Sequence, residues 1–223
     1  MEWVLLVLAA GGIVGGRRWW RGRSRRRDTE RGSHEELTAV RTLADEDVTL
    51  LGEQLQRLDA EVEGHELDEA ARRDYQVALD AYESAQRAVP RLTSTDQVST
   101  VNDTLAAGRF SLACVQARVA GVPLPTRRTP CFFNPQHGPA AVDVSWNGVG
   151  HGTRIVPSCA QDAARIERGE RPELRRVKVG GAMVPYWEAG AAYLPYGENY
   201  FTEGVISLIG MPPPSNGVGH NRF

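Results

Sequence analysis

The composition of the chain changes abruptly at a proline-rich segment, residues 123–130, and this change constrains the fold more than any other feature. Before the segment, apolar residues recur every three or four positions. After it, glycine, proline and aromatic residues dominate. The first pattern is typical of amphipathic helices and the second of short strands and turns. The sequence therefore predicts an α+β chain in which a helical part precedes a small β-rich module.

Three amphipathic segments make up the helical part, residues 28–122, after a short polar linker at residues 28–33. Short connections favour antiparallel neighbours, so we expect an antiparallel three-helix bundle. The same stripes also suit an oligomer interface. Gly108 interrupts the third stripe and marks a close helix approach, and Cys114 beside it is expected to be buried. The stripes comprise Val48, Leu51, Leu55, Leu58 and Val62; Ala71, Tyr75, Ala78, Tyr82, Ala85 and Val89; and Val98, Val101, Leu105, Gly108, Leu112, Val115 and Val119.

An uncharged apolar run at residues 3–16 precedes the bundle. A membrane-spanning helix usually needs about 20 apolar residues, but tryptophans at positions 19 and 20 and snorkelling arginines can extend the run. Residues 1–27 are therefore predicted to be a single-pass membrane anchor with a basic stop. The arginine run indicates a cell-membrane protein with its N-terminus outside and its C-terminal domains cytoplasmic. Export of the C-terminal part is the alternative. The arginines of this run are Arg17, Arg18, Arg21, Arg23, Arg25, Arg26 and Arg27.

The C-terminal module, residues 123–210, is predicted to contain two hairpins and a short helix. Residues 142–146 alternate as in a strand, residues 147–150 turn the chain, and residues 153–157 return it. Residues 160–168 follow as a helix that Gly169 ends. Residues 177–184 then form a second hairpin around a Gly-Gly turn.

Two cysteines flank the first hairpin, in the contexts Cys131-Phe-Phe-Asn134 and Cys159-Ala-Gln-Asp162. The order of knuckle, hairpin and helix resembles a treble-clef zinc finger, in which each position carries a pair of cysteines. The resemblance spans about residues 131–169 and implies that Cys131 and Cys159 match the first member of each pair. Asn134 and Asp162 stand where the second cysteines would be. The strings CFFNPQHGP, VPSC and VPYWEAG are also similar to membrane-anchored actinobacterial proteins with no assigned activity.

A zinc ion is chemically compatible with these residues, since zinc accepts thiolate, imidazole and carboxylate ligands. Cys131, Cys159 and Asp162 supply three, and His137 supplies the fourth if the chain bends back. His151 is a weaker candidate, and Asn134 suits an Asx turn better than a metal.

Two alternatives need no metal. In the first, the module is a metal-free relic in which Cys131 and Cys159 pack together and Asp162 caps the helix. In the second, the two thiols form a disulfide. A separate hypothesis is a cysteine-dependent hydrolase with Cys131, His137 and Asp143 as nucleophile, base and orienting group.

Aromatic residues are concentrated after the second hairpin, where they form either a contact surface or a cover for the core. An apolar run at residues 205–209 suits an edge strand or a partner-binding segment, and residues 211–223 are predicted to be disordered. The aromatic residues are Tyr186, Trp187, Tyr193, Tyr196, Tyr200 and Phe201.

Taken together, these features predict a non-catalytic, membrane-tethered scaffold or interaction protein. The expected partners are the membrane and another protein, without nucleic acid. A structural zinc-binding protein with the same scaffold role is the alternative.

Overall fold

The computed structural model describes residues 2–148, 152–179 and 181–190, and for residues 2–31 the backbone alone. The chain divides into two compact units, Met1–Ala39 and Val40–Phe223. The long helix α1 (Glu2–Val62) begins in the first unit, and its residues 40–62 belong to the second. Helix α1 continues through residues 28–33, where the sequence predicted a polar linker, so that prediction is wrong.

The predicted membrane anchor is also wrong. Within the described residues, no helix combines sufficient length with sufficient apolar character to cross a membrane. The uncharged run ends at Gly16, and fourteen helical residues rise only about 21 Å, against about 30 Å of hydrocarbon. Arg17 and Arg18 follow at once. This finding contradicts the membrane helix in the predicted fold, the single-pass topology and the cell-membrane localisation.

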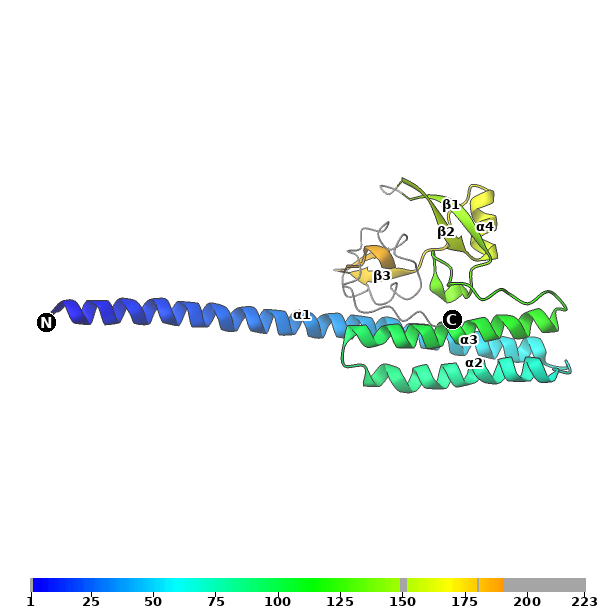
Figure 1. Cartoon of the computed structure of the whole chain (residues 1–223), viewed down its shortest axis with the longest axis horizontal. Coiled ribbons are helices and arrows are strands. Elements are labelled where there is room, and N and C mark those ends of the chain that lie inside the picture. The colour runs from blue at the N-terminus through cyan, green and yellow to red at the C-terminus, as the bar shows by residue number, and fades with distance from the viewer. Residues whose placement is uncertain (1, 149–151, 180, 191–223) are drawn as a thin grey trace. The chain divides into compact units, whose positions relative to one another are not determined.

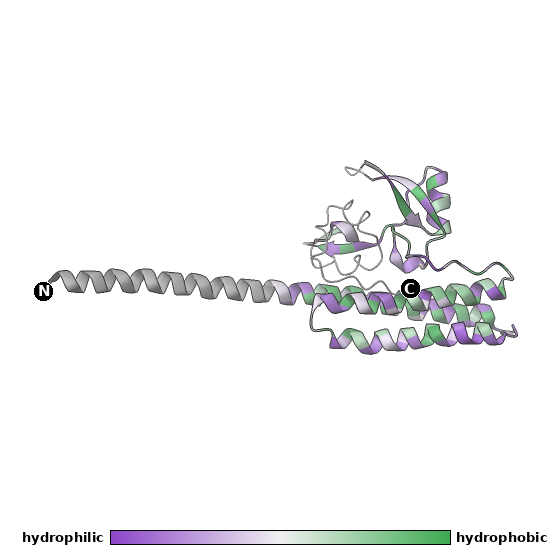
Figure 2. Cartoon of the chain, in the orientation of Figure 1, coloured by the Kyte–Doolittle hydropathy of each residue, from purple (hydrophilic) through white to green (hydrophobic). Residues whose placement is uncertain are grey.

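Helices α2 (Glu69–Ala88) and α3 (Val98–Val119) lie side by side and antiparallel (Figure 1). Asp68 caps α2 as expected, because its carboxylate accepts a hydrogen bond from the backbone N–H of Ala71. Hydrophobic residues alternate with hydrophilic ones along these helices (Figure 2). The buried apolar residues are Val40, Leu43, Ala44, Val48, Leu51, Leu55 and Leu58 in α1; Ala71, Ala78, Ala81 and Ala85 in α2; and Val98, Val101, Leu105, Leu112, Cys114, Val115 and Ala117 in α3.

Gly108 lies where α3 comes close to both α1 and α2. A Cβ atom added there would lie 2.8 Å from the Cβ of Ala81 and 3.2 Å from Cδ2 of Leu51. A side chain of any size would therefore push α3 away from α1 and α2. The predicted role of Gly108 in a close helix approach is confirmed.

The C-terminal module contains two separate antiparallel hairpins and one helix. Strands β1 (Val142–Gly148) and β2 (Gly152–Ser158) form the first hairpin, with Val144 opposite Val156. Helix α4 (Ala160–Glu167) follows directly. Strands β3 (Arg176–Val179) and β4 (Ala182–Pro185) form the second hairpin. These elements agree with the expected hairpins and helix to within a few residues. Short 3₁₀ turns lie at Val89–Arg91, Thr95–Gln97, Pro135–His137 and Tyr186–Glu188.

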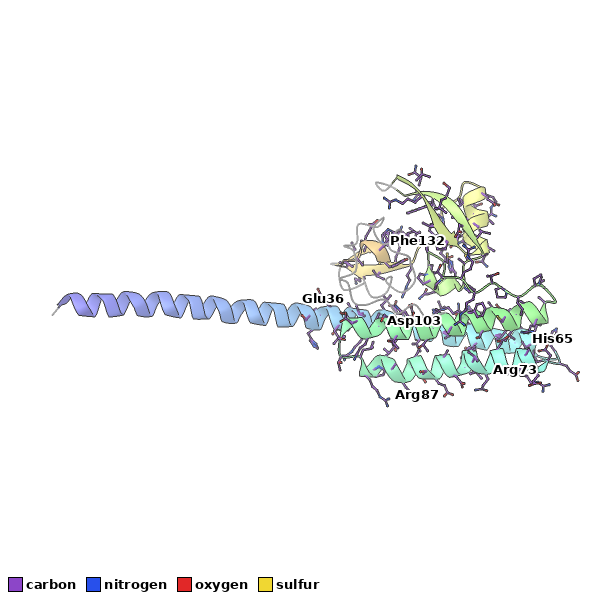
Figure 3. All side chains as sticks on the ribbon, viewed as in Figure 1. Glu36, His65, Arg73, Arg87, Asp103 and Phe132 are labelled. Atoms are coloured by element: carbon purple, nitrogen blue, oxygen red, sulfur yellow. The ribbon has the colours of Figure 1, made fainter. Side chains whose placement is uncertain are left out.

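Aromatic rings form the core between the two hairpins. Phe132 stacks on Trp187 with ring centroids 4.9 Å apart, and Trp146 meets Trp187 edge-on at 5.9 Å. The Tyr186 hydroxyl donates to the backbone oxygen of Phe132 at 2.9 Å. Figure 3 labels Phe132, which lies in this region. Tyr186 and Trp187 therefore cover the core, whereas the other aromatic residues of the tail lie outside the described residues.

A buried polar network joins the module to the bundle. The side-chain amide of Gln136 donates to the carboxylate of Asp47 on α1, and Gln54 donates to the backbone oxygen of Gln136 at 3.0 Å. Arg109 donates to the backbone oxygen of Asp47 at 3.0 Å, and Arg175 donates to its carboxylate at 3.1 Å. Because Asp47 is 1% exposed, these hydrogen bonds replace its lost hydration.

Candidate metal centre

A closed loop brings His137 back towards Cys131. The backbone N–H of Cys131 donates to the oxygen of Gly138 at 3.0 Å, and Pro130 and Pro139 form a β-bridge at the base of the loop. Gly138 has a φ of 84°, a conformation that glycine adopts without strain. Residues six apart in sequence are thereby placed on the same side of the loop.

Asn134 shapes the loop without acting as a ligand. Its side-chain oxygen accepts a hydrogen bond from the backbone N–H of Gln136 at 3.0 Å and caps the 3₁₀ turn that carries His137. This is the Asx turn expected from the sequence.

The other two residues come from the first turn of α4. Cys159 is the N-cap, and its Sγ accepts from the backbone N–H of Asp162 at 3.4 Å. The prediction that Asp162 caps this helix is wrong, because Cys159 takes that position. Residues three apart at a helix start project to the same side, so both side chains face the loop.

Cys131, His137, Cys159 and Asp162 converge in one cluster. Nδ1 of His137 lies 3.0 Å from Oδ2 of Asp162 and 3.6 Å from Sγ of Cys159. Oδ2 of Asp162 lies 3.5 Å from Sγ of Cys131 and 3.6 Å from Sγ of Cys159. All four donor atoms lie within 4.8 Å of one another. The cluster can therefore hold a metal ion.

The distances from Oδ2 of Asp162 to the other three donor atoms, and from Nδ1 of His137 to Sγ of Cys159, are close to the edges of a tetrahedral zinc site. Bonds of about 2.3 Å to sulfur and about 2.0 Å to nitrogen or oxygen give tetrahedral edges of about 3.5 Å between sulfur and either lighter atom. The same bonds give about 3.3 Å between nitrogen and oxygen. The measured sulfur edges of 3.5–3.6 Å agree, and the 3.0 Å contact between His137 and Asp162 is slightly short.

Asp162 is held so that only one of its oxygens faces the cluster. Oδ1 accepts from the Arg165 guanidinium and from the backbone N–H of Glu173, each at 2.9 Å. Oδ2 is directed at the two thiols and the imidazole. The carboxylate is fully buried, so these contacts fix its orientation. Second-shell contacts of this kind orient metal ligands.

The two nitrogens of His137 have different roles. Nδ1 faces both Asp162 and Cys159, whereas Nε2 lies 3.2 Å from the amide nitrogen of Asn134 and 3.8 Å from a carboxylate oxygen of Glu173. A catalytic triad needs one imidazole nitrogen at the nucleophile and the other at the carboxylate. Here Nδ1 faces both Asp162 and Cys159, an arrangement that differs from a triad built on Asp162 and is compatible with metal binding.

Asp143, the predicted orienting group of a thiol triad, pairs with Arg128 at the surface. The carboxylate that contacts His137 is that of Asp162. The contacts therefore do not include the triad of Cys131, His137 and Asp143.

The two thiols have pKa values shifted in opposite directions. A hydrogen bond from the Cys159 thiol lowers the pKa of Cys131 to about 5, against the effect of burial. The same hydrogen bond, together with burial, raises the pKa of Cys159. These shifts favour the thiolate form of Cys131 and the thiol form of Cys159, and a bound cation would favour thiolates at both positions.

The neighbouring groups also favour their charged forms. Burial lowers the pKa of His137, but its hydrogen bond to Cys131 and the charge of Asp162 outweigh burial and raise it. Burial raises the pKa of Asp162, but the Glu173 backbone N–H and the Arg165 guanidinium outweigh that effect and lower it. The cluster therefore holds a carboxylate and a thiolate away from water.

All three cysteines are free thiols, so the alternative of a Cys131–Cys159 disulfide is not formed in the structure. Cys114 is buried in the bundle, as predicted. The weaker candidate ligand His151 lies outside the described residues. Arg165 and Glu173 orient the cluster but were not expected from the sequence. Only the spacing of Arg165 three residues after Asp162 gave a signal for either residue.

No protein-family model, curated protein or solved structure matches the chain.

Proposed function

We propose that the C-terminal module is built around one structural zinc ion, and that the chain is a non-catalytic interaction protein. Cys131, His137, Cys159 and Asp162 are the proposed ligands. The observation that carries this proposal is the convergence of four donor atoms within 4.8 Å of one another, with Nδ1 of His137 facing two other donors at once.

The ligand count supports a structural role. Structural zinc sites are closed by four protein ligands, whereas catalytic sites keep a position for water or substrate. Cys131, Cys159 and Asp162 are buried, and the His137 side chain is 16% exposed. Four protein donors leave no position open, so this site does not supply a catalytic zinc-bound water.

The charges support zinc as the occupant. Two thiolates and the Asp162 carboxylate bring three negative charges to a dication, and the Arg165 guanidinium lies next to the excess charge. Zinc takes mixed thiolate, imidazole and carboxylate ligands, whereas magnesium and calcium prefer oxygen ligands. The order of loop, hairpin and helix also supports a treble-clef-like module, with His137 as the second ligand.

Metal content of the full chain tests the proposal. Protein purified under reducing conditions without chelator is analysed by mass spectrometry for bound metals. We expect about one zinc per chain in the wild type and in Cys114→Ser, a matched control that changes a buried thiol outside the cluster. Cys131→Ser and Cys159→Ser should lose the zinc.

Cobalt substitution tests the geometry. Tetrahedral Co²⁺ bound by two thiolates gives intense d–d absorption and sulfur-to-metal charge-transfer bands, and Cys131→Ser should weaken both. A folded wild-type chain that binds neither zinc nor cobalt would refute the proposal. So would a Cys131→Ser chain with its full zinc content.

A further inference from the structure

A solvent-open cavity of about 370 Å³ lies beside the aromatic core, and no function has been assigned to it above. Its walls come from the end of β1, the loop after α4, and the base of the β3–β4 hairpin. The indole rings of Trp146 and Trp187 contribute to the lining, and Pro172 and Pro185 add rigid apolar surface. This volume is typical of small-ligand and peptide subsites.

The aromatic wall is fixed before any ligand binds. Trp187 stacks on Phe132 and meets both Tyr186 and Trp146 edge-on. The Tyr186 backbone N–H donates to the oxygen of Arg175 at 3.0 Å. A ligand that lies on these rings therefore costs little side-chain entropy.

The rim carries two arginines that form no ion pair with the part of the chain that the structure describes. Of the five arginines between positions 165 and 176, Arg165, Arg168 and Arg175 form ion pairs. Arg171 and Arg176 form none within the described residues, and both line the cavity. Glu188 is the one acidic residue among the described lining, so the rim has a positive excess.

From this combination we infer that the cavity binds an acidic, proline-containing peptide segment of a partner protein. A proline or aromatic side chain lies on the indole rings, as in other aromatic-lined peptide grooves. Carboxylates on either side of it pair with Arg171 and Arg176. The inference names a partner class for the proposed interaction role and rests on that part of the proposed function.

The metal cluster supports both walls of this cavity. Phe132, which stacks on Trp187, follows Cys131 directly in the sequence. On the opposite side, Oδ1 of Asp162 accepts a hydrogen bond from the backbone N–H of Glu173. Glu173 lies in the loop that supplies Arg171 and Pro172 to the cavity. Assembly of the cluster thus sets the distance between the indole wall and the arginines.

Calorimetric titration of the full zinc-loaded chain with blocked hexapeptides tests the inference. The probes are EPPYEP, its neutral analogue QPPYQP, and EGGSEG, which keeps the charges without the apolar residues. We expect EPPYEP to bind most tightly, with an affinity that falls as salt rises. The indole N–H resonance of Trp146, assigned by loss in Trp146→Phe, should shift on binding.

Arginine variants locate the contact. An exposed charge pair contributes at most about fivefold in affinity, so Arg171→Gln and Arg176→Gln together should weaken EPPYEP binding by about tenfold. The matched control is Arg168→Gln, which removes an exposed arginine outside the cavity. Equal binding of the acidic and neutral peptides, or unchanged binding by the double arginine variant, would overturn the inference.

Two further results are informative. The chain's own residues 193–203 include Pro195, Glu198 and Glu203. Tighter peptide binding by a Glu198→Gln/Glu203→Gln variant would assign the cavity to that segment and overturn the partner assignment. Zinc content measured on the same samples separates the two proposals. Peptide binding by a folded chain that takes up no zinc when zinc is supplied would refute the zinc site alone, and zinc without peptide binding would refute the cavity inference alone.

Discussion

Replacing Asp162 with asparagine separates a zinc-binding cluster from a metal-free one. The substitution keeps the shape of the side chain and removes one potential ligand. If the amide oxygen keeps the bonds from Arg165 and from the Glu173 backbone, the amide N–H₂ group must face the metal. If the amide flips, its N–H₂ group faces two donors. In the first orientation, zinc loses an oxygen ligand. In the second, the substituted side chain can no longer accept the hydrogen bonds from Arg165 and from the Glu173 backbone.

The expected magnitude follows from these contacts. Changes to second-shell groups cost about 10–100-fold in metal affinity, so loss of a ligand should cost at least about 100-fold, or about 2.7 kcal/mol. The metal-free chain should change by less than about 1 kcal/mol. It loses a charge-assisted bond to the partly exposed Arg165, but it no longer buries a carboxylate charge.

Competition for zinc with a chromogenic chelator measures the affinity, and urea unfolding with and without zinc measures the stability. At saturating free zinc, Asp162→Asn should lower the free energy of unfolding by about 2.7 kcal/mol through the weaker affinity. Asp143→Asn, which changes an exposed carboxylate paired with Arg128, is the matched control. Wild-type zinc affinity in Asp162→Asn would refute the ligand assignment.

Three further predictions concern the bundle and its contact with the module. Gly108→Ala should destabilise the protein by about 1 kcal/mol in urea unfolding, because overpacking against Ala81 outweighs the gain in helix propensity, and a stabilised variant would contradict the close approach. Burial, followed by the hydrogen bond to Asp59, raises the pKa of Tyr75 to about 12. Because this folded-state pKa exceeds the usual value near 10, the stabilisation is complete below pH 10 and is lost as the pH rises towards 12. An absorbance titration should show one late tyrosine that titrates earlier in Asp59→Asn. Gln136→Ala should cost about 2 kcal/mol by removing a partner of the buried carboxylate on α1, with zinc content unchanged, and loss of zinc would show that the contact also builds the metal cluster.

Local sequence rules located the candidate ligands better than their surroundings. Cys159 and Asp162 are three residues apart at a helix start, which was enough to place both on one side of α4. His137 required a loop that turns back on Cys131, and only the Asx turn expected at Asn134 indicated such a loop; Gly138, whose positive φ closes it, was not recognised from the sequence. Arg165 and Glu173 were not anticipated, since Glu173 reaches the cluster only through the tertiary fold.

The largest error was the predicted membrane anchor, which depended on adding flanking residues to an apolar run that is too short by itself. The apolar run at residues 3–16 was extended by assuming that Arg17 and Arg18 would snorkel, although charged residues at the edge shorten the apolar stretch. Asp47 is a second residue whose environment differs from the one that its local sequence suggests. As an acidic residue on an amphipathic helix it looks solvent-facing, yet it is buried by Gln136 and Arg175, which lie 89 and 128 residues further along the chain. No local pattern reports such a partner.

The candidate metal cluster and the cavity are connected by short segments, which would give the proposed zinc a role beyond stability. Both connections are direct: Phe132 follows Cys131 in the sequence, and the backbone N–H of Glu173 donates a hydrogen bond to Asp162. If the proposed zinc leaves, it no longer fixes the Asp162 carboxylate that binds the Glu173 backbone. The loop that bears Arg171 is then free to move relative to the indole rings. Chelation should therefore weaken binding of the acidic peptide even while the bundle stays folded. Unchanged peptide affinity after complete removal of zinc would show that the aromatic core alone shapes the cavity.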